Sequence, residues 1–415
     1  MSPTEHYPLS TKAELNLAHD DGDTPLCIAE RNGHTAIADT LSAAIAGRNK
    51  LPENARQRAS LLYTILRHKF VLSILEYLLL RQYTNDHLPP VIKEKLIIDT
   101  DPGIDDALAI YCALNDDAGE VLALTTVFGN AAIETTTENA LRLLDIFGRN
   151  IPVHKGAAGP LILPLGEYPS LIHGENGLGN IPLPKASKTP ESSNAAQYIV
   201  EMANAHPGEI TLVALGPLTN LALALQLDPG IERKIKKVVL MGGNLPASDN
   251  LPTSDNLPTS DNASTARNAN TVRDPHAAES VLSAFWPVTV VGLNVTRSVT
   301  ATPAFFARLE QRKPVEGKFL HDITRHYLNF YQHQYGINGC YVHDATAVAC
   351  ALHPEWFAVE RGQLRVQCDE INRGIMAIHG KNTLNNSDNL WDDRPIQSAA
   401  VTVNSHKVLS WIQSL

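Results

Sequence analysis

The sequence predicts an α/β fold with a mostly parallel open sheet flanked by helices. From Glu94 onward, short apolar runs alternate with segments of helical periodicity, which is typical of repeated β-α-β units. Toward the carboxyl end, about residues 362–403 favour short strands, and a terminal helix is expected from His406. The segment before residue 93 has helical patterns only, so a small all-α appendage is expected there.

Each expected element follows from its residues. The strands are apolar runs too short for helices, and we place them at residues 96–99, 121–127, 210–215, 238–241 and 288–293. The helices are longer amphipathic or alanine-rich segments, and we place them at residues 132–147, 194–206, 218–225, 275–285, 317–335 and 345–351.

Residues 1–92 are expected to form a separate helical region, followed by a main domain over residues 93–415. Thr24-Pro25-Leu26 and Gly33-His34 resemble elements of one ankyrin repeat. A single repeat cannot bury its own apolar face. A helical stripe of apolar residues between 53 and 83 would cover it, and Pro89-Pro90 marks a linker.

Composition excludes several classes of function. The net charge of −10 and the lack of a basic stripe argue against a nucleic-acid partner. The five cysteines form no C-x-x-C pair, so zinc is unsupported and a reduced, cytoplasmic state is expected. The amino terminus has no signal-peptide pattern, and the most apolar run, residues 70–80, is too short to span a bilayer.

Four carboxylates follow the first strand of the main domain within eight residues: Asp99, Asp101, Asp105 and Asp106. Such crowding raises at least one pKa unless a cation neutralises the group. Pro102 and Gly103 bend the chain, and Asp105-Asp106 begins a helix. The pattern indicates a strand-loop-helix metal site at the carboxyl edge of the sheet. A solvated acidic turn and an aspartyl phosphatase are the alternatives.

The run DTDPGIDDALAI at residues 99–110 resembles the signature of the inosine-uridine-preferring nucleoside hydrolase family. Six later motifs resemble the family in the expected order, and together they extend the resemblance over about residues 93–415. They are VFGN at 127–130, HGENGLG at 173–179, ALGPLTNLA at 214–222, VLMGG at 239–243, DPHAA at 274–278 and HDATAV at 343–348.

The resemblance implies a calcium ion and assigns roles around it. Its ligands fall on Asp101, Asp106, Asp344 and the main-chain carbonyl of Leu215. Asp105 is implied as the general base on a water, with Asp99 as a supporting carboxylate near the sugar. His343 is implied as the acid that protonates the departing base, for which an imidazole pKa near neutrality is suitable.

Further positions are implied to contact the substrate. Tyr327 and Tyr331 lie four residues apart on one helix face, where they could stack on the nucleobase, although ordinary core packing is the alternative. The remaining substrate-binding candidates, most of them expected near the sugar, are Asn130, His173, Met241, Asn262, Asn268 and Asn270.

The sequence departs from the family in one loop and at two further positions. A polar hexapeptide repeats three times from Asn244 to Asp261, and we interpret residues 244–262 as a tandem insertion into an active-site loop. Asn268 stands where the family has a glutamate near the sugar 5′ end, which weakens binding of a free 5′-hydroxyl or admits a 5′ substituent such as phosphate. Asn294 replaces a frequent aspartate and is expected to be structural.

The predicted function is calcium-dependent hydrolysis of the N-glycosidic bond of ribonucleosides to ribose and free base, as in purine or pyrimidine salvage. The alternative is a catalytically impaired protein that binds nucleosides or nucleotide derivatives, with the ankyrin-like head recruiting a protein partner. A homo-oligomer is compatible with the resemblance. The sequence does not decide between purine and pyrimidine bases.

Overall fold

The computed structural model describes residues 93–245, 267–379 and 393–415. The expected ankyrin-like region and linker before residue 93 lie outside the described residues. The same holds for most of the hexapeptide repeat, with Asn262.

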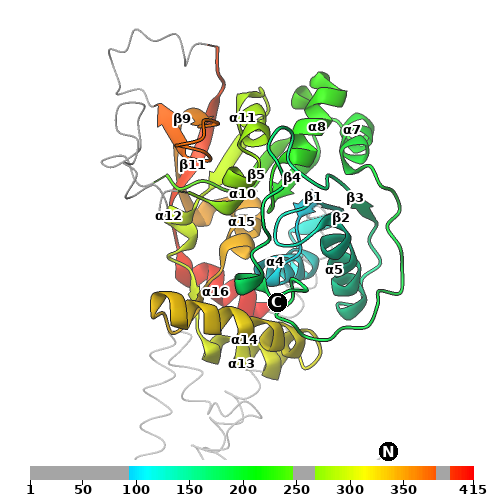
Figure 1. Ribbon diagram of the computed structural model, residues 1–415, viewed down its shortest axis with the longest axis vertical. Coiled ribbons are helices and arrows are strands. Elements are labelled where there is room, and N and C mark those ends of the chain that lie inside the picture. The colour runs from blue at the N-terminus through cyan, green and yellow to red at the C-terminus, as the bar shows by residue number, and fades with distance from the viewer. Residues whose placement is uncertain (1–92, 246–266, 380–392) are drawn as a thin grey trace, which may run out of the picture. The chain divides into compact units, whose positions relative to one another are not determined.

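A nine-stranded sheet forms the centre of the main domain (Figure 1). Its order is β10-β9-β11-β6-β5-β4-β1-β2-β3, and a separate small sheet pairs β7 with β8. Strands from β3 to β11 along this order run parallel, whereas β9 is antiparallel to both β11 and β10. The strands are β1 Glu94–Thr100, β2 Gly119–Thr126, β3 Val153–Lys155, β4 Ile210–Ala214, β5 Lys237–Met241, β6 Val288–Val291, β7 Thr300–Ala301, β8 Cys340–Tyr341, β9 Phe357–Val366, β10 Met376–His379 and β11 Ile396–Val403.

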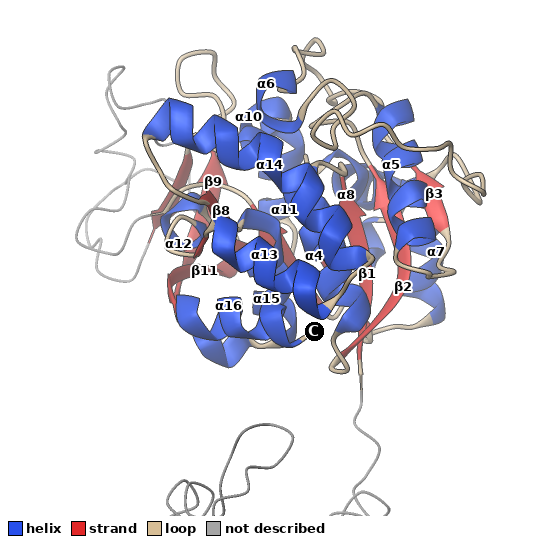
Figure 2. Ribbon diagram, turned by 90° about the horizontal axis from the view of Figure 1, so that it is seen from below, coloured by secondary structure: helices blue, strands red, loops and turns tan. Residues whose placement is uncertain are grey.

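Helices cover both faces of the sheet (Figure 2). They are α4 Ile104–Asn115, α5 Ile133–Ile146, α6 Ser170–His173, α7 Ala195–Ala205, α8 Thr219–Leu227, η1 Pro229–Arg233, α10 Ala269–Arg273, α11 Pro275–Ser283, α12 Leu293–Thr296, α13 Pro303–Arg312, α14 Glu316–Tyr335, α15 His343–Leu352, η3 Pro354–Trp356 and α16 Ser405–Ser414.

Two apolar cores result from the alternation of side chains along the strands. In β1, Leu96 and Ile98 pack with α4, α5, α14 and α15. Ile97 between them points to the other face and packs with α7, α8 and α11. A strand buried on both faces explains why β1 is a continuous apolar run. No described helix is long and apolar enough to cross a membrane, and the cytoplasmic location stays a prediction.

The predicted α/β class is confirmed, and the expected strands and helices are present with shifted ends. The strand expected to reach residue 293 ends at Val291, because Leu293 begins α12. The helix expected from residue 345 begins at His343, which places His343 and Asp344 in its first turn. The elements β3, α6 and α10 are too short to show a periodic pattern of apolar residues, so the sequence did not predict them.

The order of the strands places the acidic run at a ligand-binding position. β1 pairs with β2 on one side and with β4 on the other, so connections leave the carboxyl ends of β1 and β4 in opposite directions along the sheet. Such a switch point opens a crevice at the carboxyl edge, where open α/β sheets bind ligands. The loops after β1, β2, β4 and β5 all converge there.

Candidate active site

The turn between β1 and α4 is held by its own carboxylates. Asp106 accepts hydrogen bonds from the Gly103 backbone N–H at 2.9 Å and from the Thr100 hydroxyl at 2.5 Å. A third donor, the side-chain amide of Asn130, reaches the same carboxylate at 3.0 Å. A Cβ at Gly103 would meet the His173 ring at 2.6 Å, so the turn requires glycine there.

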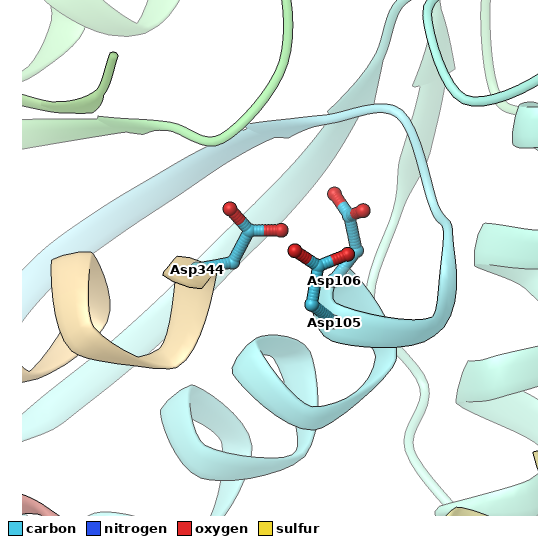
Figure 3. Close-up of side chains that lie close together, drawn as sticks. All are labelled: Asp105, Asp106 and Asp344. Atoms are coloured by element: carbon cyan, nitrogen blue, oxygen red, sulfur yellow. The ribbon is translucent and has the colours of Figure 1, made fainter. Parts of the chain in front are cut away.

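Three carboxylates converge at the carboxyl edge of the sheet (Figure 3). Asp105 and Asp106 come from the first turn of α4, and Asp344 comes from the first turn of α15. One oxygen from each can be chosen so that the three lie within 4.8 Å of one another. Two segments more than two hundred residues apart in sequence therefore build one acidic cluster.

Burial and mutual repulsion raise the pKa values in this cluster. Burial raises the pKa of Asp105 to about 6. Burial, followed by the charge of Asp105, raises that of Asp106 to about 6. For Asp344, burial and the charges of Asp105, Asp106 and Asp101 all raise the pKa well above its usual range. Because like charges in a buried site strongly favour protonation or a cation, this geometry fits a metal ion.

Asp101 lies beside the cluster. Its Oδ2 accepts from the Asn130 backbone N–H at 2.7 Å, whereas its buried Oδ1 has no hydrogen-bond partner. That free oxygen lies 2.6 Å from the position of a Cβ built on Gly216, directly after Leu215. The carbonyl of Leu215 accepts from the Asn270 side-chain amide at 2.6 Å, which leaves its second lone pair.

Asp99 is fully buried in β1 beneath the turn. Its Oδ1 accepts from the Thr125 hydroxyl at 2.6 Å and from the Asn220 amide at 2.7 Å, while Oδ2 has no partner. Burial raises the pKa of Asp99 to about 7, against the lowering effect of these two donors. One oxygen each of Asp99, Asp101 and Asp105 is thus buried without a hydrogen-bond partner, and carboxylate oxygens are the ligands that hard cations such as calcium take.

His173 lies against Asp105 as a neutral ring. Its Nδ1 accepts from the Ile104 backbone N–H at 3.2 Å and is 3.8 Å from Asp105 Oδ1. Because Nδ1 is an acceptor, the ring proton is on Nε2. Burial lowers the pKa of His173 to about 4. The ring stacks on Tyr327, with 5.6 Å between the centroids.

A chain of hydrogen bonds connects Asp105 to His343. The Tyr327 hydroxyl donates to Asp105 Oδ2 at 3.4 Å and pairs with the Tyr331 hydroxyl at 3.4 Å. Tyr331 in turn pairs with His343 Nε2 at 3.1 Å, and His343 Nδ1 pairs with the Thr296 hydroxyl at 2.7 Å. With Asp105 ionised, each group in this chain donates toward Asp105, which places the imidazole proton on Nε2.

The pKa expected for His343 was wrong. Burial lowers the pKa of His343 to about 3, so the imidazole is neutral at pH 7 rather than half-protonated. Neither ring nitrogen is free, because Thr296 and Tyr331 occupy both. Tyr327 and Tyr331 are themselves 3% and 6% exposed and belong to the core, so they combine core packing with a polar contact at the site.

Helix α10 approaches the site from the ends of β4 and β5. Asn268 caps it by accepting from the backbone N–H groups of Asn270 and Thr271. The Asn270 amide donates to the carbonyls of Leu215 and Met241, at 2.6 and 3.0 Å. The Asn268 amide faces the sulfur of Met241 at 3.4 Å. Four of the predicted site residues, Leu215, Met241, Asn268 and Asn270, are therefore brought together here.

Several residues that shape the site were missed by the sequence reasoning. Asn220 bridges Asp99 to the carbonyl of Thr126, and Asn139 ties the carbonyls of Pro102 and Asn176 together. Thr100 and Thr296 hold Asp106 and His343. Asn220 stood inside a quoted motif, but an asparagine or threonine near a helix start usually indicates a cap, so nothing marked it as a partner of Asp99.

Asn294 has the structural role expected of it. Its side chain accepts from the Leu245 backbone N–H and donates to the Ala400 carbonyl, both at 3.0 Å. It therefore joins the start of the repeat loop to β11, away from the carboxylates.

Comparison with known proteins identifies a family and several similar proteins. The family described as inosine-uridine preferring nucleoside hydrolase matches residues 96–410. A probable uridine nucleosidase 2 of Oryza sativa subsp. japonica is 37% identical over 333 residues, which cover 80% of this chain and 95% of that protein. A solved plant nucleoside hydrolase has a TM-score of 0.71 at 34% identity, over 79% of this chain and 98% of its own. A purine-preferring ribonucleoside hydrolase from Gardnerella vaginalis has a TM-score of 0.68 at 30% identity, over 77% and 97%.

Proposed function

Because the chain belongs to the inosine-uridine preferring nucleoside hydrolase family and cleaves the N-glycosidic bond of ribonucleosides, we propose that the acidic cluster at the β1–α4 turn carries this reaction. The observation that supports the assignment is the meeting of Asp105 and Asp106 with Asp344, which lies more than two hundred residues later in the sequence. In this reaction, water adds to C1′ of the ribose as the bond to the base breaks.

We propose calcium as the cofactor. Asp101, Asp106, Asp344 and the carbonyl of Leu215 would hold it; the three side chains are buried carboxylates, and Asp101 keeps a free oxygen beside Gly216. When bound, the ion would raise the acidity of water and bind the ribose hydroxyls. Asp105 is the alternative candidate for a calcium ligand, because its carboxylate lies within 4.8 Å of those of Asp106 and Asp344.

Asp105 is proposed as the general base. Its Oδ1 accepts no hydrogen bond from protein, so it can accept a proton from water, and burial places its pKa near 6. A base with a pKa near 6 is ionised at neutral pH and still binds a proton well. Asp101 also has a buried oxygen that accepts no hydrogen bond. Substituting each residue in turn is therefore needed to show which of the two is the base.

The hydrogen-bonded tyrosines are proposed to help the base depart. The departing base leaves with the electron pair of the N-glycosidic bond and needs a proton. Neutral His343 would become an imidazolate if it gave up Nε2–H, so the proton comes from the attacking water instead. Asp105 would take that proton, and the Tyr327 hydroxyl beside it would give its own proton to the departing base and regain one from Asp105. His343 would hold the Tyr331 hydroxyl, which pairs with that of Tyr327, so the imidazole is proposed to act through the tyrosines rather than by direct donation.

The pentose is proposed to lie among the remaining polar side chains. Asn130 and Asn270 reach the carboxylates and the Leu215 carbonyl, respectively, and each keeps a side-chain oxygen for a sugar hydroxyl. Asp99 lies at the end of β1, directly before the turn, and would support it there. The Nε2–H group of His173 could donate a further hydrogen bond to the sugar. Met241 bounds the same region, and Asn262 stays a prediction.

Uridine is the first substrate to test, because similar proteins carry the name uridine nucleosidase. The experiment measures free base released from uridine, cytidine, inosine and adenosine, with calcium and with a chelator. We expect release that depends on calcium. Binding of nucleoside without release from any substrate would contradict the proposal and favour an impaired binding protein.

The amino-terminal region is proposed as a separate unit. Residues 1–92 precede the family match, which starts at residue 96. We propose that this ankyrin-like region recruits a protein partner and that the hydrolase domain, residues 93–415, forms a homo-oligomer. Turnover by residues 93–415 alone, equal to that of the full chain, would support the division.

A further inference from the structure

Three arginines around α10 form no ion pair with any residue that the structure describes. Arg267 precedes the helix, Arg273 ends it, and Arg373 lies in the adjacent turn. The Nε atoms of Arg267 and Arg373 are buried without any hydrogen bond. The hydrogen bonds found for Arg267 and Arg273 go to the backbone carbonyls of Ile371 and Glu167. Within the described residues, therefore, none of the three guanidinium groups is in an ion pair, and the charge of Asp101 acts on Arg273 from a greater distance.

This arrangement differs from the nearby cations of the same domain. Arg394 and Arg365 both pair with Glu279, with Nη1 of Arg394 only 2.6 Å from the carboxylate. Partly buried cations are normally paired, because an uncompensated charge away from water is costly. The chain as a whole is acidic, with a net charge of −10, so the unpaired arginines are not part of a general basic surface. An anion from outside the chain would supply the missing partner.

The three arginines lie at α10 and at the turn that packs against it, next to the candidate active site. The Arg267 guanidinium donates to the Ile371 carbonyl, and the Thr271 hydroxyl donates to the Gly374 carbonyl at 2.9 Å, so the turn that carries Arg373 packs on α10. Two other side chains at this helix, Asn268 and Asn270, reach Met241 and the Leu215 carbonyl. The charge of Arg273 also acts on Asp101.

The elements around the site suggest which of them each substituent of a bound ribose would face. The ring hydroxyls would face the carboxylates of α4 and α15. The base at C1′ would face the tyrosines of α14, which contact Asp105. The remaining substituent of the sugar is C5′, and the remaining element is α10, at the ends of β4 and β5.

Building on the proposed function, we propose that Arg267, Arg273 and Arg373 form a subsite for a 5′-phosphate, so that ribonucleoside 5′-monophosphates are substrates. Asn268, whose amide can donate a hydrogen bond, suits an anionic 5′ group better than a carboxylate would. In the reaction, water bonds to C1′, the N-glycosidic bond breaks, and the base leaves with its electrons and one proton. The products are ribose 5-phosphate and free base.

The test compares uridine with uridine 5′-monophosphate, using the full chain with calcium. For the wild-type protein we expect kcat/KM for the monophosphate to equal or exceed that for uridine. The double substitution Arg267→Gln and Arg273→Gln should lower the ratio of the two kcat/KM values at least tenfold, whereas Arg273→Lys, which keeps the charge, should lower it less. Arg149→Gln is the matched control, because Arg149 contacts Asn115 at the far end of α4.

Each outcome decides the inference. Base release from uridine with none from the 5′-monophosphate would overturn the subsite and leave the proposed function intact, as would a ratio unchanged by the double substitution. If neither compound releases base, calorimetry with uridine 5′-monophosphate decides instead: binding that the double substitution weakens at least tenfold supports the subsite, and equal binding by both proteins overturns it.

Discussion

At the scale of single residues, two carboxylates of the site have one oxygen that accepts hydrogen bonds from the protein and one that accepts none. Asp99 and Asp101 each give one oxygen to protein donors and leave the other buried without a partner. An oxygen in that state is costly unless a ligand or proton meets it. Asp106 differs, because both of its oxygens accept hydrogen bonds from the turn itself.

The first prediction separates the base from the metal ligands. Asp105→Asn should lower kcat for uridine hydrolysis by about 10²- to 10⁴-fold, because an amide cannot accept the proton of the attacking water. Calcium affinity, measured by calorimetry, should stay close to that of the wild type. Asp344→Asn should instead weaken calcium binding strongly.

Asp101→Asn completes the comparison. If Asp101→Asn abolishes turnover with calcium still bound, and Asp105→Asn costs calcium affinity, then the roles of Asp101 and Asp105 are the reverse of those proposed.

At the scale of elements, short segments position the polar side chains. Helix α10 has five residues, too few for an isolated helix, so its cap and its contacts stabilise it. Helices α4, α15 and α16 meet at Asp116, whose Oδ2 binds His353 Nε2 at 2.7 Å and the Trp411 indole N–H at 2.5 Å. The helices that carry the site carboxylates are thus joined at their far ends.

The cap of α10 is expected to be a measurable stabilising contact. Asn268→Ala removes the acceptor for the N–H groups of Asn270 and Thr271, and should lower the free energy of unfolding by about 1 kcal/mol. Asn268→Asp keeps the acceptor and should cost less. Urea unfolding of both proteins measures the difference. An equal loss in both would show that the amide contact with Met241, rather than the cap, is what matters.

The junction at Asp116 predicts a dependence of stability on pH. Burial alone would raise the pKa of Asp116, but hydrogen bonds from His353, Ala118 and Trp411 outweigh it and lower the pKa below its usual value. A carboxyl with a lower pKa in the folded state stabilises above its unfolded pKa, near 4, and loses this as the pH falls through the folded pKa. His353→Ala should therefore cost about 1 to 2 kcal/mol at pH 7 and less at pH 3.

Urea unfolding at the two pH values, with Asp116→Asn as control, tests this. A loss of the same size at pH 7 and pH 3 would assign the effect to the stacking of His353 on Trp356, with 4.2 Å between the ring centroids, instead of the hydrogen bond.

At the scale of the whole molecule, the acidic cluster would couple folding to the binding of the proposed calcium ion. The carboxylates come from two segments far apart in the sequence, so a ligand that bridges them stabilises only the folded chain. Calcium at a hundred times its dissociation constant should add about 2.7 kcal/mol to the free energy of unfolding. A chelator should remove that gain, which thermal unfolding would measure.

The gain should shrink at low pH. Of the proposed ligands, Asp106 has a pKa of about 6 without an ion and the pKa of Asp344 is raised well above its usual range, so at pH 5 protons compete for the site and calcium stabilises less than at pH 7.5. Asp344→Asn is the control, because it should lose most of the gain at both pH values. Stabilisation by calcium that is unchanged between pH 5 and pH 7.5 would argue against these carboxylates as the ligands.

The sequence by itself determined the α/β class and the long elements, and it predicted the acidic run after the first strand as the candidate site. Apolar runs buried on both faces and amphipathic helices have legible periods, and four carboxylates within eight residues leave few structural uses. The tertiary structure alone decided which groups meet. Burial and contacts between distant segments set the neutral state of His343 and the chain through Tyr331 and Tyr327 to Asp105. They also leave the arginines around α10 without an ion pair among the described residues. Local patterning does not encode those properties, because a pKa or a missing counter-ion depends on everything packed around the group.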